Sequence, residues 1–293
     1  MKNKKIVFAA GISVLSAITI VVCSCSEHSG TVYNSTESVG QDGVNVESAS
    51  STPESTETSA PNDISVPDAP ATSIPAPKPK YDDPDSYIKY DKSTDTYSLS
   101  EEEEKLGKES LFVGDSICLG FSTWSVVDSK NVYATGNVGA RNMLDYEMYY
   151  LSEPAKFTYV LNETKPKNIF FWMGMNDVNM TSSEEYCENY KTIIDTALKI
   201  STADVYVCAI TPVSNLKFTE PVYISEFNDA IRHFVQTNYK DRVHIINFGE
   251  PLKNADGILD EQYNGGDGIH LSRKAYYVAM HEINTQIKKI KER

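Results

Sequence analysis

From residue 111 onward, short apolar runs rich in β-formers alternate with longer stretches in which apolar residues recur at helical spacing. The β-rich runs cover residues 111–113, 131–134, 168–173, 205–210 and 243–248, and the main helical stretches cover 183–200, 224–239 and 273–290. Parallel strands need long crossover connections, usually helices, so this alternation predicts an α/β domain with a five-stranded parallel sheet. The segment is long enough to bury one core.

Four short blocks with reactive or hydrogen-bonding groups lie at the edge of this sheet where the strands end. In chain order they are Gly-Asp-Ser at 114–116, a glycine at 139, Gly-Met-Asn-Asp at 174–177 and Asp-Gly-Ile-His at 267–270. Gly114 ends the first run and permits a sharp turn, so Ser116 opens the next helix with its hydroxyl facing outward. Helix N-terminal amides there can stabilise a developing negative charge. The blocks together offer a nucleophile, oxyanion donors and a base.

These blocks resemble the SGNH/GDSL hydrolase family, whose Ser, Gly, Asn and His occur in this order on a flavodoxin-like three-layer α/β/α sandwich. The resemblance covers residues 105–291. It implies that Ser116 is the nucleophile and that His270 is the base. Asp267 would orient the imidazole and stabilise its cationic form.

The same resemblance implies an oxyanion hole formed by three donors: the backbone amides of Ser116 and Gly139 and the side-chain amide of Asn176. The second block departs from the family, because Gly139 is followed by Ala-Arg where an Asp-Thr type pair is typical. Gly136 therefore competes with Gly139 for this role. A purely structural interpretation makes Ser116 a helix cap and the other blocks turns, but the agreement of all four blocks favours catalysis.

The remaining histidines and cysteines give no competing site. His28, His233, His244 and His281 lack a carboxylate at the right offset in a loop on the active edge. Beyond the N-terminal segment only Cys118, Cys187 and Cys208 remain, an odd number that argues against a disulfide framework. No cysteine–histidine cluster has metal-ligand spacing, so we expect neither a metal nor a cofactor.

Large side chains beside the blocks are candidates for a substrate pocket. Trp172 falls inside a β-rich run, which predicts a core position. Trp124 and Met175 lie just beyond the first run and within the third block, so we expect these two to contact substrate.

The N-terminus resembles a bacterial lipoprotein signal peptide. Lys2, Lys4 and Lys5 precede an uncharged apolar run at 6–22, and Ser24 precedes Cys25. This pattern predicts cleavage before Cys25 and lipidation of that residue, with residues 1–25 as the signal. An uncleaved membrane anchor is the alternative, since the run approaches a bilayer-spanning length. Both interpretations place the remainder outside the cytoplasmic membrane, and the first anchors it by lipid to the bacterial cell surface.

Composition divides the rest of the chain. Residues 26–80 are rich in Ser, Thr, Pro and Glu and are expected to be a disordered linker. Residues 81–104 are expected to pack as an arm, whose acidic run at 101–104 starts a helix with a solvated face, and 105–293 form the hydrolase domain. Seven basic and 17 acidic residues up to position 104 account for −10 of the net charge of −14. The domain therefore lacks a strong field for nucleic acid, which we do not expect it to bind.

The sequence as a whole predicts a monomeric surface serine esterase that hydrolyses short-chain, chiefly acetyl, carboxylic esters of carbohydrate through an acyl-enzyme intermediate. One alternative is an O-acyltransferase for a cell-wall or surface glycan, in which a sugar hydroxyl replaces water. Another is a non-catalytic binding lipoprotein on the cell surface. The expected partners are the ester substrate and, through the lipid anchor, the membrane.

Overall fold

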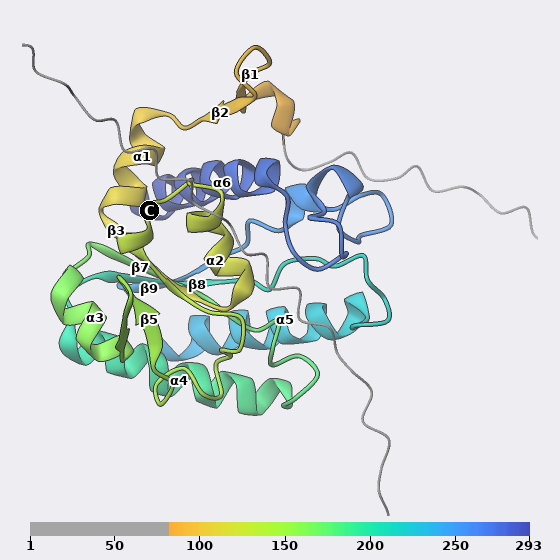
Figure 1. Ribbon diagram of the computed structural model, residues 1–293. Helices are drawn as coiled ribbons and strands as arrows, with labels where there is room; N and C mark the ends of the chain where they lie inside the picture. Colours follow the sequence, from red (N-terminus) through yellow and green to blue (C-terminus); the bar gives the residue numbers. More distant parts are fainter. Residues whose placement is uncertain (1–81) are drawn as a thin grey trace, which may run out of the picture. The chain divides into compact units, whose positions relative to one another are not determined.

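Five parallel strands form the central sheet of the computed structural model, which describes residues 82–293 (Figure 1). They are β3 (Ser110–Gly114), β4 (Val132–Ala134), β7 (Asn168–Trp172), β8 (Asp204–Cys208) and β9 (Val243–Ile246). Their spatial order is β4-β3-β7-β8-β9. In chain order this is 2-1-3-4-5, the flavodoxin-like arrangement, so the predicted fold is confirmed.

Six α-helices within the described residues complete the three layers. In Figure 1, α1 (Glu101–Lys108), α2 (Ser116–Thr123) and α6 (Arg273–Lys291) lie on one side of the sheet. On the other side are α3 (Phe157–Thr164), α4 (Ser183–Ile200) and α5 (Pro221–Asn238). Helix α4 has the predicted bounds, whereas α5 begins three residues earlier because Pro221 is well suited to the first helical turn.

Burial on both faces explains why the strands read as continuous apolar runs. Every residue of β3 and β7 is buried. Phe112, Phe170 and Tyr206 stack across neighbouring strands with ring centroids 4.8 and 5.0 Å apart. Trp172 is 2% exposed, so its predicted core position is confirmed. Cys118, Cys187 and Cys208 are free and buried.

The segment before the sheet packs on α6. It contains the short helix η1 (Pro84–Ser86) and the hairpin β1 (Lys89–Asp91) and β2 (Thr96–Ser98). Tyr87 stacks on His281 of α6 with ring centroids 3.9 Å apart. The expectation of a fully solvated acidic run is wrong at Glu103, which is 6% exposed. Its carboxylate bonds His281 and closes a capping box with Ser100 at the start of α1.

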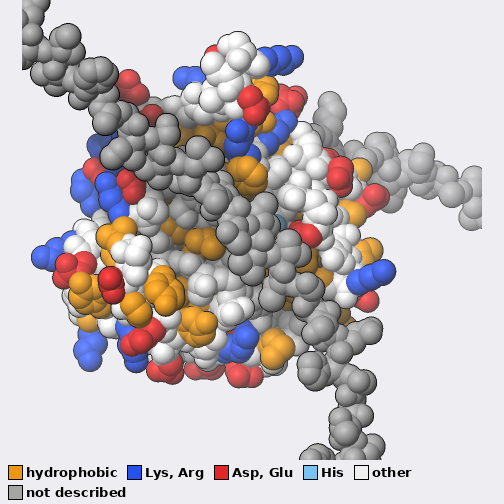
Figure 2. All heavy atoms as spheres, in the orientation of Figure 1, with side chains coloured by type: hydrophobic (Ala, Val, Ile, Leu, Met, Phe, Trp, Pro, Cys, Tyr) orange, Lys and Arg blue, Asp and Glu red, His pale blue; other side chains and the backbone are white. Residues whose placement is uncertain are grey.

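Smaller elements connect the main ones. They are the hairpin β5 (Met148–Tyr150) and β6 (Glu153–Ala155), with the short helices η2 (Ser129–Asn131), η3 (Glu250–Leu252) and η4 (Glu261–Tyr263). On the face drawn in Figure 2, basic and acidic side chains are interspersed. Within residues 82–293, no helix has the length and apolar character needed to cross a bilayer. The predicted signal at 1–25 and linker at 26–80 lie outside the described residues.

Candidate active site

Ser116, His270 and Asp267 form a continuous chain of hydrogen-bonding contacts. Ser116 is the first residue of α2, directly after the turn that ends β3. Its Oγ lies 2.9 Å from Nε2 of His270, and Nδ1 of His270 lies 2.5 Å from Oδ2 of Asp267. An ionised carboxylate only accepts, so Nδ1 carries the hydrogen and Nε2 is left to accept the serine proton. The three groups can therefore transfer a proton from the hydroxyl.

Backbone hydrogen bonds fix the loop that carries the histidine. Oδ1 of Asp267 accepts the N–H groups of Ile269 and His270, at 2.9 and 2.8 Å. Asn264 Oδ1 accepts the N–H of Gly268 at 2.8 Å. Gly268 has a φ of 77°, a left-handed conformation that glycine adopts without strain. Asp267 thus orients both the imidazole and the loop that presents it.

The pKa of Asp267 is lowered by its surroundings. Partial burial works in the opposite direction, but hydrogen bonds from the His270 ring and from two backbone N–H groups outweigh it. The carboxylate therefore stays ionised at neutral pH and can stabilise a protonated imidazole.

Asp115, between the strand and the serine, is in a different environment. It is 1% exposed and caps α2 by accepting the Ile117 N–H at 2.9 Å. Burial raises the pKa of Asp115 to about 7, and the nearby charge of Asp177 adds to the effect. Its position ties the helix that presents Ser116 to the interior of the domain.

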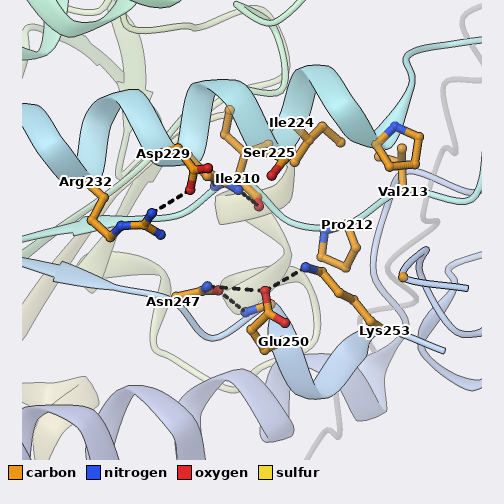
Figure 3. Close-up of a pocket in the computed structure, with 14 residues that line it drawn as sticks. Ile210, Pro212, Val213, Ile224, Ser225, Asp229, Arg232, Asn247, Glu250 and Lys253 are labelled. Carbon is orange, nitrogen blue, oxygen red and sulfur yellow. Dashed lines mark hydrogen bonds and ion pairs between the residues drawn. The ribbon is translucent and has the colours of Figure 1, made fainter. Parts of the chain in front are cut away.

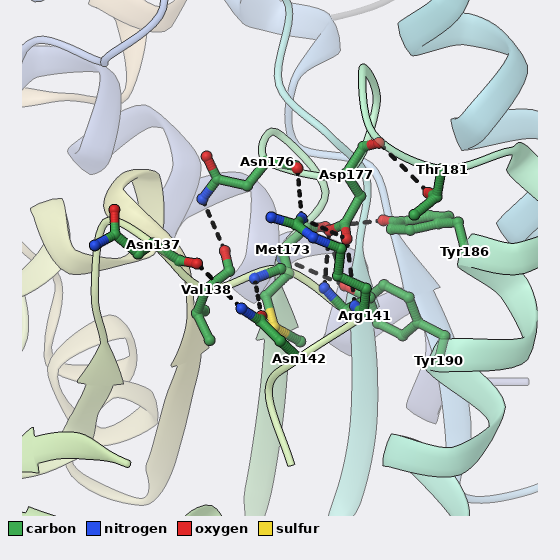
Figure 4. A network of polar contacts seen from close by, with 12 residues as sticks. Asn137, Val138, Arg141, Asn142, Met173, Asn176, Asp177, Thr181, Tyr186 and Tyr190 are labelled. Atoms are coloured by element: carbon green, nitrogen blue, oxygen red, sulfur yellow. Dashed lines mark hydrogen bonds and ion pairs between the residues drawn. The ribbon is translucent and has the colours of Figure 1, made fainter. Parts of the chain in front are cut away.

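A second buried carboxylate joins the second and third blocks (Figure 4). Asp177 accepts the backbone N–H groups of Ala140 at 2.8 Å and Arg141 at 3.3 Å, and lies 3.2 Å from Nη1 of Arg141. The same Nη1 donates to the backbone carbonyl of Asn176 at 2.6 Å. Asp177 is fully buried. Sequence reasoning missed this network, although opposite charges directly beside the two blocks were an available signal.

The three expected oxyanion donors differ in what they contact. Gly139 donates its N–H to Oδ1 of Asn142 at 2.9 Å. Asn176 donates Nδ2 to the carbonyls of Gly136 at 2.8 Å and Val138 at 2.7 Å. The Ser116 N–H opens α2, where the helix itself supplies no acceptor. The expected hole is thus not fully open, because loop donors pair with the nearest acceptors; an oxyanion would compete with these contacts.

Space distinguishes the two candidate glycines. A Cβ added at Gly139 would lie 2.6 Å from both carboxylate oxygens of Asp177 and 2.7 Å from Arg141 Nη1. A Cβ at Gly136 would meet nothing within 4 Å. Only glycine therefore fits at 139 without displacing the Asp177 network.

A depression of about 330 Å³ lies beside Asn176. Its lining includes Asn137, Arg141, Met175, Asn179, Met180 and Phe218. Met175, a predicted substrate contact, is in this lining, although only 5% of it is exposed. Trp124, the other predicted substrate contact, is not in this lining. It caps the end of α2 remote from Ser116, and the eight residues of that helix span about 12 Å.

Other polar groups in the described residues do not join the triad. A small cavity of about 90 Å³ lies near the ends of β8 and β9. Beside it, Arg232 pairs with Asp229, and Glu250 bonds both Asn247 and Lys253 (Figure 3). Within residues 82–293, no group of three or more His, Cys, Asp or Glu residues is placed to hold a metal ion.

The sequence matches the model of a known family. The model of the GDSL-like lipase/acylhydrolase family matches residues 112–278, more than half of the chain. A search of curated proteins found no match.

Solved structures of several proteins are similar to this chain to different degrees. A candidate acylhydrolase from Bacteroides fragilis NCTC 9343 is 17% identical with a TM-score of 0.50, and the match covers 62% of this chain and 88% of that one. A GDSL-like lipase from Bacteroides thetaiotaomicron VPI-5482 is 17% identical with a TM-score of 0.49, and the match covers 64% of this chain and 90% of that one. A carbohydrate acetylesterase from Sinorhizobium meliloti is 13% identical with a TM-score of 0.43, and the match covers 62% of this chain and 99% of that one.

Proposed function

Because the chain belongs to the GDSL-like lipase/acylhydrolase family, we propose that it hydrolyses short-chain, chiefly acetyl, esters of carbohydrate at the bacterial cell surface. The observation that carries the chemical part of this proposal is the unbroken contact from Ser116 through His270 to Asp267. The family makes the chain a serine hydrolase of carboxylic esters. The acyl length, the alcohol and the location are the proposed part.

The proposed reaction has two halves. His270 Nε2 takes the proton of Ser116 Oγ as the oxygen bonds the ester carbon, and the carbonyl electrons move to the oxygen. The Ser116 N–H stabilises this oxyanion, joined by Gly139 and Asn176 once they exchange their present acceptors. Collapse breaks the bond to the alcohol, which leaves with the proton from His270. Water, deprotonated by His270, then releases the carboxylic acid and restores the hydroxyl.

The lining beside Asn176 supports a polar alcohol group. Asn137, Asn179 and Arg141 supply amide and guanidinium groups that can hydrogen-bond sugar hydroxyls. Phe218 and Met180 add apolar surface, and Met180 is 67% exposed. This mixed, shallow lining suits a sugar ester with a small acyl group better than a long acyl chain, which needs an extended apolar channel.

The proposed location depends on the N-terminal sequence. A basic start, an apolar run and Ser24-Cys25 support cleavage and lipidation at Cys25. Growth with a fatty-acid label should give a labelled protein in the membrane fraction, and Cys25→Ala should remove the label. A wild-type protein without label would contradict the proposed anchor.

The catalytic proposal is tested with a fluorophosphonate probe and Ser116→Ala. We expect the wild type to be labelled and to hydrolyse an aryl acetate, and the variant to lose both while its Tm stays nearly unchanged. Labelling that survives in the variant would remove Ser116 from the role of nucleophile. A folded wild type that is neither labelled nor active would instead favour a binding lipoprotein.

The substrate is tested by comparing kcat/KM on aryl acetate and aryl palmitate, followed by acetate release from acetylated xylan and O-acetylated peptidoglycan. We expect preference for acetate and release from at least one polymer. Preference for palmitate, or no release from any polymer, would overturn the carbohydrate proposal. Acetyl transfer to an added sugar without free acetate would identify an O-acyltransferase.

A further inference from the structure

A groove runs between the N-terminal arm and the helix pair α2 and α6, away from the serine. It consists of two depressions of about 350 and 470 Å³ that share Tyr97, Ser125 and Tyr277 in their linings. The first also includes Trp124 and Arg273. We refer to these five residues as the arm groove. Its combined size falls in the usual range of ligand sites.

Aromatic rings dominate one wall of the arm groove and are held in place. Trp124 is 41% exposed although it is one of the largest apolar side chains. Tyr97 packs against Tyr277 with ring centroids 5.1 Å apart, and the guanidinium carbon of Arg273 lies 5.1 Å from the Tyr97 centroid. Tyr90 also packs on the Tyr97 ring, with centroids 4.6 Å apart, so Tyr97 forms a fixed wall beside the exposed Trp124 before any ligand binds.

Charged side chains around the groove are already neutralised. Arg273 pairs with Asp95 at 2.9 Å. In the second depression, Lys108 pairs with Glu104 at 3.0 Å and Lys130 with Asp128 at 3.4 Å. A charged ligand would have to displace one of these partners, whereas a neutral ligand would not. Ser125, Thr96 and Thr123 line the first depression with hydroxyl groups. Thr96 bonds the Thr94 hydroxyl and Thr123 donates to the Leu119 carbonyl, so these two can still accept a hydrogen bond from a ligand.

We propose that the arm groove is a second binding site, separate from the active site, for a neutral and unesterified stretch of polysaccharide. The C–H face of a pyranose ring carries partial positive charge and packs on the negative face of an aromatic ring, here that of Trp124, since the Tyr97 ring already packs against Tyr90, Tyr277 and Arg273. The ring hydroxyls meet the hydroxyl groups and the Arg273 guanidinium at the groove margin. Exposed aromatic faces, hydroxyls and paired charges together fit this ligand class. The proposal goes beyond the esterase activity and does not depend on it.

The test uses the full chain with Ser116→Ala, so that binding is measured without turnover. The sequence contains only Trp124 and Trp172, and Trp172 is 2% exposed, so a change in tryptophan emission on titration reports on Trp124. The probes are xylohexaose, cellohexaose and chitohexaose, with calorimetry in parallel. We expect a saturable blue shift and a heat of binding with at least one of them.

Variants then locate the binding. Trp124→Ala should weaken calorimetric affinity about tenfold. Tyr97→Ala should also weaken it, because it removes the ring on which Tyr277 and Arg273 pack, and Tyr97→Phe, which keeps that ring, should retain affinity. Tyr149→Ala is the matched control, because Tyr149 is 74% exposed on β5 and should leave affinity unchanged. The proposal would be overturned by no binding of any probe or by unchanged affinity in Trp124→Ala. It would also be overturned if shielding of Trp124 depended on protein concentration alone, since the groove would then bind a second copy of the chain.

Discussion

Replacing Gly139 by alanine places a methyl group where the structure leaves no room. The added Cβ would lie 2.6 Å from both oxygens of the Asp177 carboxylate, and ordinary contacts begin near 3.4 Å. The carboxylate and the second block must therefore separate by about 0.8 Å. Neither side can yield easily, because Asp177 is fully buried and the glycine is part of the backbone that its neighbours bond.

The expected cost follows from the hydrogen bonds that this separation breaks. A shift of 0.8 Å takes the Ala140 N–H, now 2.8 Å from Oδ2, beyond hydrogen-bonding distance, and the longer Arg141 N–H contact at 3.3 Å is lost with it. Hydrogen bonds to charged groups are each worth about 1.5–3 kcal/mol, so we expect a loss of about 3–6 kcal/mol. For a domain of this size, at about 2–4 °C per kcal/mol, that lowers Tm by roughly 6–24 °C. Displacing Gly139 and Asn176 by nearly 1 Å should also reduce kcat about a hundredfold.

Gly136→Ala is the matched control, because its Cβ would meet nothing within 4 Å. We expect it to change stability by about 1 kcal/mol or less and to retain activity. The measurements are kcat and KM on aryl acetate below each variant's Tm, with Tm from calorimetry. Wild-type kcat in Gly139→Ala, or an equal loss in Gly136→Ala, would refute the steric reasoning and the assignment of Gly139 to the site.

Three further substitutions test neighbouring groups. Arg141→Ala should lower kcat roughly tenfold to a hundredfold with a smaller change in KM, because it removes the hydrogen bond to the Asn176 carbonyl, and Arg141→Lys should recover part of the loss. Equal kcat in the wild type and both variants would show that Arg141 does not position Asn176. Asp267→Asn should lower kcat by orders of magnitude between pH 6 and 9, since the lowered pKa of Asp267 keeps its carboxylate ionised there; a pH–rate profile with wild-type activity would contradict this. The pKa of Asp115 is raised to about 7, so its contribution to stability is fully present below the ordinary aspartate range and is lost as pH rises through about 7. Asp115→Asn should therefore flatten the Tm–pH curve between pH 4 and 8, and an unchanged slope would contradict the raised pKa.

The fold was predictable because its signals are local. Strand β3 is apolar throughout since both faces of the sheet are covered, and Gly114 ends it before a helix that begins at Ser116. The same continuity in β7 located the third block at the neighbouring strand end. Order along the chain then placed His270 in a loop before the last helix, within reach of the serine.

The contacts made by the oxyanion donors could not be read in this way. Whether the Gly139 N–H faces a ligand or Asn142 depends on a turn of a few residues, and the two carbonyls bonded by Asn176 come from a loop some 40 residues earlier. Side-chain partners at such separations are set by packing of loops, which have no periodic pattern. Trp124 shows a different limit: it follows α2, the helix that Ser116 opens, so about 12 Å of helix separates two residues that are near in sequence.

The carboxylates around Ser116 divide their roles by burial. Asp267 has a half-exposed side chain and bonds an imidazole that must change charge, so solvent and His270 together accommodate the charged state. Asp115 and Asp177 are buried and bond mainly backbone N–H groups, which hold α2 and the second block in fixed positions. Replacing either buried carboxylate by alanine should therefore lower Tm together with kcat. Asp267→Asn should lower kcat with little change in Tm, because its side-chain oxygen can still accept the Ile269 and His270 N–H groups while the charge that stabilises the imidazolium is lost.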